Sequence, residues 1–212
     1  MKTKPTPIFH ITHKNNLEKI INSKGLHCVS SLSSKSNSYT NIAHNSIQDL
    51  RATTVVPVDP FGTLHEYVPF YFAPRSPMLY TIHRGNVTGY SDGQKPIVYL
   101  VTTIEEIEKQ SIPFCFTDGH GIMYFTNYYK ELTFLNQIDW EVMKMKYWSD
   151  TPEDNDRKRR RQAEFLIHSF LPLNSIKAIC VINNSIKDDI NKLLEIHNVT
   201  NIPVLVKDDW YY

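Results

Sequence analysis

The sequence contains few cysteines and no long apolar run. Its three cysteines, Cys28, Cys115 and Cys180, lie far apart, and no two of them form a CxxC pair. An odd number of separated thiols argues against a disulfide framework or a zinc ribbon and fits a reducing compartment, so we expect a cytoplasmic protein. A membrane span needs about 18 consecutive apolar residues, which the chain lacks, and the N-terminal MKTKPTPIF has no apolar signal segment. We therefore expect no membrane association and no secretory leader.

The chain also lacks an excess of charge of either sign. Lysine and arginine number 23 and aspartate and glutamate 22, which gives a formal net charge of +1. A polyanion would therefore be held by a local cationic patch rather than by the field of the whole protein. The charge balance neither requires nor excludes nucleic acid. Neither an internal repeat nor a compositional break divides the 212 residues, so we expect one domain over residues 1–212.

What the sequence does contain is an alternation of short strands and amphipathic helices. Runs rich in β-branched and aromatic residues predict strands, and apolar residues repeated at helical spacing predict helices. The predicted strands cover residues 7–12, 66–73, 97–103, 113–118, 163–171, 176–182 and 203–207. The predicted helices cover residues 15–24, 76–83, 103–110, 139–148 and 185–197, and Gly25 is the expected stop of the first.

Two long regions interrupt this alternation. Residues 30–48 are rich in serine and asparagine, which predicts a loop with a short helix near its end. A loop of that length inside a compact domain suggests a binding role. Residues 119–155 carry several aromatic side chains and lead into a run of five cations, Arg157 to Arg161.

A single carboxylate follows the cationic run at the start of an apolar segment. In the predicted strand AEFLIHSF, Glu164 shares one face with Leu166 and His168, because side chains alternate between the two faces of a strand. Glu164 therefore faces a cleft or the rim of the sheet. The spacing alone leaves three interpretations open: a charge that protects a sheet edge, a salt-bridge partner of the preceding arginines, or a functional carboxylate.

The first predicted strand carries two histidines that cannot share a metal ion. In FHITH, His10 and Thr12 lie on one face and His13 lies on the other. We therefore expect no metal site here and consider His10 and Thr12 as hydrogen-bonding groups. A lone histidine on a strand is more often structural than functional.

Several segments, taken together, resemble the DarT family of bacterial DNA ADP-ribosyltransferase toxins. They are PIFHITHKNNLEKIINSKGLH, an arginine near residue 50, YVPFYFAPRSPMLYTIHRG, FTDGHG and RRQAEFL, and the resemblance extends from about Pro7 to the closing DDWYY. It implies an α+β, ADP-ribosyltransferase-like fold with two small packed β-sheets flanked by helices. It also implies sequence-selective transfer of ADP-ribose from NAD+, used as a substrate without a metal, to a base in single-stranded DNA. A thymine ring nitrogen is the expected acceptor, and nicotinamide is released.

The resemblance implies roles for individual residues. Glu164 would be the catalytic glutamate and Arg51 the catalytic arginine, at the end of a loop that covers the dinucleotide. His10 would bond the ribose through its side chain, and residues 25–27 would close over the ligand. The implied NAD+-binding residues are His10, Ile11, Thr12, His27, Arg51 and Tyr71. The aromatic and basic segment before Glu164 would hold the DNA through His120, Tyr124, Lys144, Lys146, Arg157 and Arg160.

The residues themselves leave several of these roles open. Tyr71 is either a core aromatic or a wall beside nicotinamide, and the aromatic and basic side chains before Glu164 are either DNA contacts or ordinary core and surface residues. Arg51, without the resemblance, would be a surface arginine. A guanidinium is a poor base, so we favour a role in binding phosphate or an anionic base over proton acceptance. Asp49 places a carboxylate near a site for two anionic ligands and could weaken their binding.

The chemistry explains why one carboxylate suffices. Cleavage of the bond between nicotinamide and ribose develops positive charge on the sugar, and a buried carboxylate on the ribose hydroxyl stabilises that transition state. Three classes of function remain: a DNA-modifying toxin, an NAD+-dependent transferase or glycohydrolase with a protein or RNA acceptor, and a nucleic-acid-binding module without catalysis. The toxin hypothesis, which we favour, implies a macrodomain antitoxin of the DarG type that removes the ADP-ribose.

Overall fold

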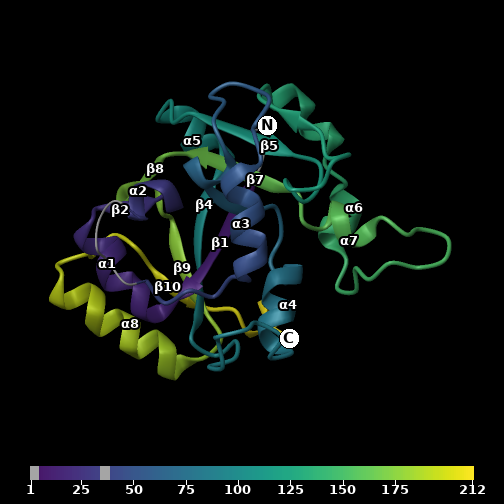
Figure 1. Ribbon diagram of the computed structural model, residues 1–212. Helices are drawn as coiled ribbons and strands as arrows, with labels where there is room; N and C mark the ends of the chain where they lie inside the picture. The colour runs from purple at the N-terminus through teal and green to yellow at the C-terminus, as the bar shows by residue number, and fades with distance from the viewer. Residues whose placement is uncertain (1–4, 34–38) are drawn as a thin grey trace.

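The computed structural model describes residues 5–33 and 39–212, with their helices and strands labelled in Figure 1. The strands are β1 (Pro7–His13), β2 (Gly25–His27), β3 (Tyr67–Tyr71), β4 (Ile97–Thr103), β5 (Phe114–Thr117), β6 (Tyr128–Tyr129), β7 (Glu164–His168), β8 (Phe170–Pro172), β9 (Ala178–Val181) and β10 (Val204–Val206). The helices are α1 (Leu17–Asn22), α2 (Val29–Ser33), α3 (Asn45–Thr53), α4 (Pro77–His83), α5 (Ile104–Lys109), α6 (Trp140–Lys144), α7 (Arg157–Arg160) and α8 (Asn184–Ile196).

The larger sheet consists of two halves that meet at one residue pair. Its eight strands have the order β10-β9-β4-β1-β3-β7-β5-β6. β1 is paired with β4 along its whole length, from Pro7 opposite Thr103 to His13 opposite Ile97. Toward β3, in contrast, β1 is paired only at Phe9, which lies opposite Tyr71. The two halves of the sheet therefore diverge beyond this residue pair, and a cavity can form between β1 and β3.

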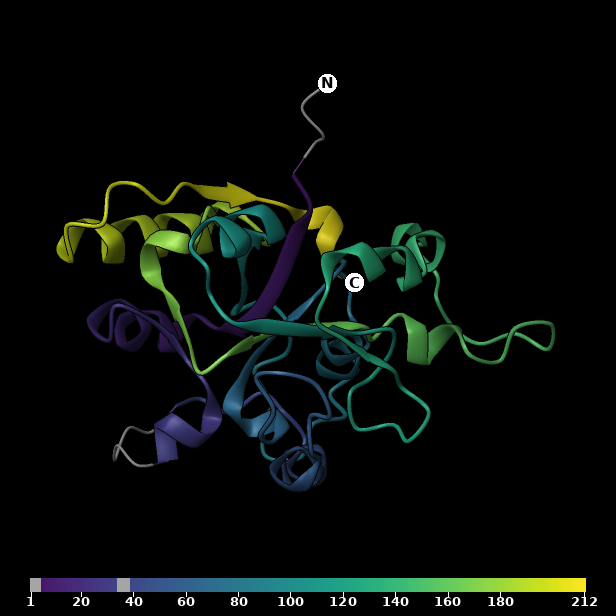
Figure 2. The ribbon, with the colours of Figure 1, turned by 90° about the horizontal axis from the view of Figure 1, so that it is seen from above.

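The central strands bury both of their faces, because the sheet is covered on both sides. In β4, Val98 and Leu100 belong to one apolar core, whereas Tyr99 and Val101 belong to the other. In the first core, α8 contributes Ile190 and Leu194. Figure 2 shows α8 and α3 at opposite sides of the molecule. Helix α4 packs into the second core.

A second sheet of two strands, β2 and β8, lies beside the larger one. A Cβ atom at Gly25 would lie 2.2 Å from the carbonyl oxygen of Leu171, and the φ of Gly25 is +154°. Only glycine permits this close approach. The prediction that the first helix ends at Gly25 is corrected by the structure. Helix α1 ends at Asn22, and Lys24 takes the left-handed conformation with φ 61°. Gly25 is the first residue of β2.

The predicted α+β fold with two sheets and flanking helices is confirmed, although the sheets differ in size. The strand predicted over residues 163–171 is divided into β7 and β8 at Ser169, whose φ of 65° redirects the chain into the second sheet. The loop predicted over residues 30–48 contains α2 and the start of α3, and its residues 34–38 lie outside the described residues.

The helix predicted over residues 139–148 is shorter than expected. It spans Trp140–Lys144, after which Met145 is extended. The carbonyl groups of Val142 and Met143 accept hydrogen bonds from Arg161 at 2.7 and 2.6 Å. This arginine contact takes the place of a further helical turn. The segment between α6 and α7 projects from the body of the protein in Figures 1 and 2.

Within the described residues, no helix combines the length and the apolar character needed to cross a bilayer.

Candidate active site

A cavity of about 940 Å³ is bordered by both halves of the larger sheet. Its wall includes side chains of β1 and β3, of helices α3 and α4, of the first residue of β7 and of the loop after β5. All the residues that the sequence analysis predicts for catalysis and NAD+ binding line this one cavity, together with one predicted DNA contact. They are His10, Ile11, Thr12, His27, Arg51, Tyr71, His120 and Glu164.

Glu164 and Arg51 form a buried ion pair on the wall of this cavity. Nη1 of Arg51 donates to both carboxylate oxygens of Glu164, at 3.0 and 2.9 Å. The two residues are only 3% and 7% exposed. Glu164 thus pairs with an arginine distant in sequence rather than with the cations that precede it. Nη2 of Arg51 is buried and has no hydrogen-bond partner among the described residues, so it is a donor available to a ligand.

His120 lies close to the same carboxylate. Its Nδ1 is 3.6 Å from Oε1 of Glu164. Burial lowers the pKa of His120, more than the neighbouring Glu164 raises it, and Arg51 lowers it further. The imidazole is therefore neutral near pH 7. The carboxylate therefore has one cation and one neutral ring as close neighbours.

His10 connects the two halves of the sheet where they diverge. Its Nδ1 is 2.8 Å from the carbonyl oxygen of Pro69 on β3. A carbonyl can only accept, so Nδ1 carries the proton and Nε2 is left as an acceptor. Burial lowers the pKa of His10, although the bond to Pro69 partly opposes this shift. A neutral ring with one free acceptor on the cavity wall can receive a hydrogen bond from a hydroxyl group.

Asn16, which the sequence analysis did not single out, ties the edge of the serine-rich region to β1. Its Nδ2 donates to Oγ1 of Thr12 at 3.0 Å and to the carbonyl of Thr40 at 3.0 Å. Its Oδ1 accepts from the amide of Thr40 at 2.8 Å. Thr40 is thereby held next to the strand that carries His10. An asparagine after a strand has no distinctive pattern, so the sequence offered no signal for this role.

Tyr71 lies beside Glu164, because the two residues face each other in the pairing of β3 with β7. Its hydroxyl donates to the sulfur of Met78 at 3.7 Å. Burial, and then the charge of Glu164, raise the pKa of Tyr71, so the phenol stays protonated. Both Tyr71 and Met78 line the cavity.

The other predicted DNA-binding residues lie outside the cavity wall. Arg157 pairs with Asp154 at 3.1 Å, and Arg160 pairs with Asp139 and, at 2.6 Å, with Asp154. Lys144 pairs with Glu141 at 2.7 Å. The remaining two residues, Lys146 and Tyr124, are exposed, and the Tyr124 side chain is fully so.

The cavity wall instead includes a different arginine of the cationic run, which the sequence analysis did not single out. Arg159 is held by Asp156 at 2.7 Å and Asp118 at 3.0 Å, and its guanidinium lies 5.3 Å from the centre of the Phe125 ring. Phe125 is 60% exposed, and both residues line the cavity. Because α7 is a single turn, neighbouring arginines of the run point in different directions.

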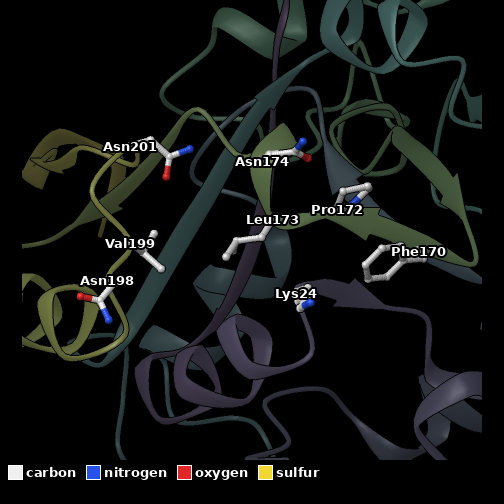
Figure 3. Close-up of a pocket in the computed structure, with 8 residues that line it drawn as sticks. All are labelled: Lys24, Phe170, Pro172, Leu173, Asn174, Asn198, Val199 and Asn201. Carbon is white, nitrogen blue, oxygen red and sulfur yellow. The ribbon is translucent and has the colours of Figure 1, made fainter.

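A second, smaller hollow of about 450 Å³ lies elsewhere on the surface (Figure 3). Its side chains come from the residue before β2, from β8 and the turn after it, and from the connection after α8. Lys24 is its charged residue, and several others are asparagines. None of the residues predicted for catalysis, NAD+ or DNA lines it.

Comparison with known proteins places this geometry in a family. A family model described as "ssDNA thymidine ADP-ribosyltransferase, DarT" matches residues 9–212. A protein of Thermus sp. (strain 2.9), named DNA ADP-ribosyl transferase, is 41% identical over 209 residues, which cover 98% of this chain and 97% of the relative. A protein of Thermosipho africanus, named a DNA ADP-ribosyl transferase-DNA ADP-ribosyl glycohydrolase fusion, is 25% identical over 97% of this chain and 49% of its own length.

Solved structures agree with the sequence comparisons. Thermus sp. 2.9 DarT in complex with ADP-ribosylated single-stranded DNA superposes with a TM-score of 0.92 at 38% identity, covering 99% of this chain and 98% of that one. The same protein in complex with NAD+ gives a TM-score of 0.87 at 36% identity, with 100% of both chains covered. The chain therefore belongs to the DarT family of single-stranded DNA thymidine ADP-ribosyltransferases.

Proposed function

We propose that this protein transfers ADP-ribose from NAD+ to a base in single-stranded DNA, and that the cavity lined by Glu164 and Arg51 is its active site. The observation that carries the proposal is the buried ion pair on the wall of a cavity of about 940 Å³. Pockets for cofactors fall in this range of volume. The DarT structures with NAD+ and with ADP-ribosylated single-stranded DNA support the same assignment.

Glu164 is the proposed catalytic carboxylate. In the reaction the bond between the nicotinamide nitrogen and ribose C1′ breaks, and the bonding electrons leave with neutral nicotinamide. The sugar becomes an oxocarbenium-like cation, which a carboxylate hydrogen-bonded to a ribose hydroxyl stabilises more strongly than the ground state. Because β7 is paired on both sides, with β3 and β5, its first residue is held on a rigid element.

The proposed NAD+ contacts are groups on the cavity wall. His10 is neutral and offers Nε2 to a ribose hydroxyl, because its Nδ1 proton is already bound by Pro69. Tyr71 provides an aromatic wall next to Glu164. The remaining proposed contacts are Ile11, Thr12, His27 and Arg51.

Arg51 is proposed to stabilise the acceptor base. A ring nitrogen of thymine becomes nucleophilic as its proton leaves, so negative charge develops on the base while the new bond to C1′ forms. Nη2 of Arg51 is a buried donor without a partner among the described residues, and a guanidinium stays protonated. It can therefore bind the anionic base while Nη1 keeps its contact with Glu164. Thymine as the acceptor is part of this proposal.

The DNA is proposed to approach over the loop after β5 and the segment before β7. His120, Tyr124, Lys144, Lys146, Arg157 and Arg160 remain our proposed contacts, because exposed rings and cations suit single strands. Arg157 and Arg160 lie outside the cavity wall, so we expect them to contribute less than Arg159 and Phe125, which line it.

We also propose that the whole chain is one ADP-ribosyltransferase domain, a toxin that acts in the cytoplasm against a macrodomain antitoxin of the DarG type. The family match over residues 9–212 supports the single domain. Three buried, unpaired cysteine thiols fit a reducing compartment. The Thermosipho africanus protein, whose name joins a transferase to a DNA ADP-ribosyl glycohydrolase, supports a partner that removes the modification.

The test of this function is a comparison of acceptors by mass spectrometry. The protein is incubated with NAD+ and with matched single strands that contain or lack thymine, with the corresponding RNA, and with an unrelated protein. We expect a mass gain of one ADP-ribose on the thymine-containing DNA strands alone. Release of nicotinamide without a DNA adduct, or modification of RNA or protein, would contradict the proposed acceptor.

A further inference from the structure

A buried hydroxyl group connects the backbone of Glu164 to the loop that carries His120. Thr117 is the last residue of β5 and is 0% exposed. Its Oγ1 donates to the carbonyl of Gly119 at 2.7 Å and accepts from the amide of Glu164 at 3.0 Å. One side chain therefore holds the start of β7 and the start of the loop at a fixed separation.

This contact occurs where the pairing of β5 with β7 ends. The two strands are paired at Phe114 and Ile167, Cys115 and Leu166, and Phe116 and Phe165. Thr117 and Glu164 are the next residues on each strand, and Thr117 is itself paired with Tyr128 of β6. At this point the side-chain oxygen of Thr117, rather than a further register pair, connects the two strands.

The loop after β5 is fixed at its other positions as well. Oγ1 of Thr126 donates to the carbonyl of His120 at 2.9 Å, and the hydroxyl of Tyr128 donates to the carbonyl of Gly121 at 2.6 Å. A Cβ atom at Gly119 would lie 2.3 Å from Nη1 of Arg159, so the backbone packs directly on that guanidinium. With these anchors, the ring of His120 lies 3.6 Å from the carboxylate of Glu164.

We propose that Thr117 is a positioning residue for ADP-ribose transfer: its hydroxyl sets the separation between the Glu164 carboxylate and the His120 loop. The inference rests on the proposed function, in which Glu164 faces the sugar and His120 contacts the DNA. Thr117 touches neither substrate and acts through the backbone of Glu164 and Gly119. The attacking nitrogen must approach C1′ in line, and a misplacement of about 1 Å can cost about 10²-fold in rate.

The test compares Thr117→Val, which keeps the shape but removes the hydroxyl, with Thr117→Ser, which keeps the hydroxyl. We expect Thr117→Val to lower kcat for DNA modification by about tenfold to 10²-fold, with the KM for NAD+ near its native value. Thr117→Ser should recover most of the rate. Thermal unfolding is measured for both variants, because a purely structural role would lower the melting temperature and leave kcat of the folded protein unchanged.

Each outcome decides the inference. A folded Thr117→Val protein with native kcat overturns it, and so does an equal loss in the serine variant, because the hydroxyl would then not be the cause. If the valine variant does not fold, Thr117→Ala is assayed in the same way, and native kcat in that variant also overturns the inference. Failure of the proposed function is a separate result, since the unmodified protein would then give no DNA adduct at all.

Discussion

The arginines of this protein occupy two contrasting environments. Arg51 is buried, contacts one carboxylate through Nη1 and keeps Nη2 free of partners among the described residues. The cationic run after residue 156 is largely neutralised: Arg157, Arg159 and Arg160 are paired with aspartates. The number of cations in a segment is therefore a poor measure of the charge it can offer to DNA, whereas one isolated arginine keeps a donor for chemistry.

The largest expected effect comes from Arg51. Arg51→Lys keeps the positive charge but removes the planar guanidinium group, whose two Nη atoms can contact Glu164 and a ligand at the same time. We expect the rate of DNA modification to fall by about 10²-fold to 10³-fold, as for the loss of other preorganised donors. Rate measurements at saturating NAD+ and DNA test this, with circular dichroism as a check of the fold. A native rate in Arg51→Lys would mean that a positive charge at this position is sufficient for DNA modification and that the guanidinium geometry is not needed.

The second effect concerns stability and the last arginine of the run. Arg161 is 4% exposed and donates to the carbonyls of Val142, Met143 and Pro74 at 2.6 to 2.7 Å. Burial lowers the pKa of Arg161 to about 10, which leaves it charged at neutral pH. Arg161→Met leaves three carbonyls without this donor, so we expect the free energy of unfolding to fall by about 3 kcal/mol.

Denaturant unfolding measures this loss, and the exposed Lys158 supplies the control. Lys158→Met should change the free energy of unfolding by no more than about 0.5 kcal/mol. Equal stability of the two variants would show that Arg161 is not a structural anchor.

A smaller effect separates two arginines of the same turn. Arg159 lines the cavity, whereas Arg157 pairs with Asp154 away from it. Arg159→Gln should raise the KM for DNA by about tenfold. If Arg159 contacts a phosphate, the variant should also show a weaker salt dependence: the slope of the logarithm of the DNA-binding constant against the logarithm of the salt concentration should be smaller in magnitude by about 0.7. Arg157→Gln should leave both values near native. The reverse order of effects would assign the DNA path to the other side of α7.

The smallest expected effect is a pH dependence of stability that comes from His10. The pKa of His10 is lowered from its usual value of 6.5, so the unfolded chain binds more protons just below that pH. Stability should therefore be fully present above about pH 6.5 and decrease as the pH falls below it. Denaturant unfolding between about pH 5 and 7.5 should show a shallower dependence in His10→Gln. The exposed His83 provides the control. An unchanged slope in His10→Gln would contradict a half-buried, neutral His10.

The longer strands could be predicted from local pattern, because β1, β4 and β7 have continuous or alternating apolar residues that pack on both faces of the sheet. The short strands β2 and β6 were not predicted. Helix α3 was expected only as a short helix at the end of a loop, since Arg51 is its one buried residue and it has no apolar stripe. The break at Ser169 has no sequence signal, because a left-handed serine is set by the surrounding strands.

The site was predictable only in part. The family resemblance named both Glu164 and Arg51, but their direct contact joins positions 113 residues apart, which no local spacing reveals. The roles of Thr117, Asn16 and Arg161 depend on hydrogen bonds with backbone groups of distant segments. A threonine or an asparagine at the end of a strand carries no pattern that distinguishes such a role.

The most direct test of the account measures the transfer rate and the NAD+ dissociation constant for Glu164→Gln. Glu131, which is exposed, supplies the matched control Glu131→Gln. We predict that Glu164→Gln binds NAD+ within about threefold of native affinity while its single-turnover rate falls by about 10²-fold or more, and that Glu131→Gln behaves as native protein. A native rate in Glu164→Gln, or a loss of rate explained entirely by unfolding, would contradict the claim that Glu164 stabilises the transition state.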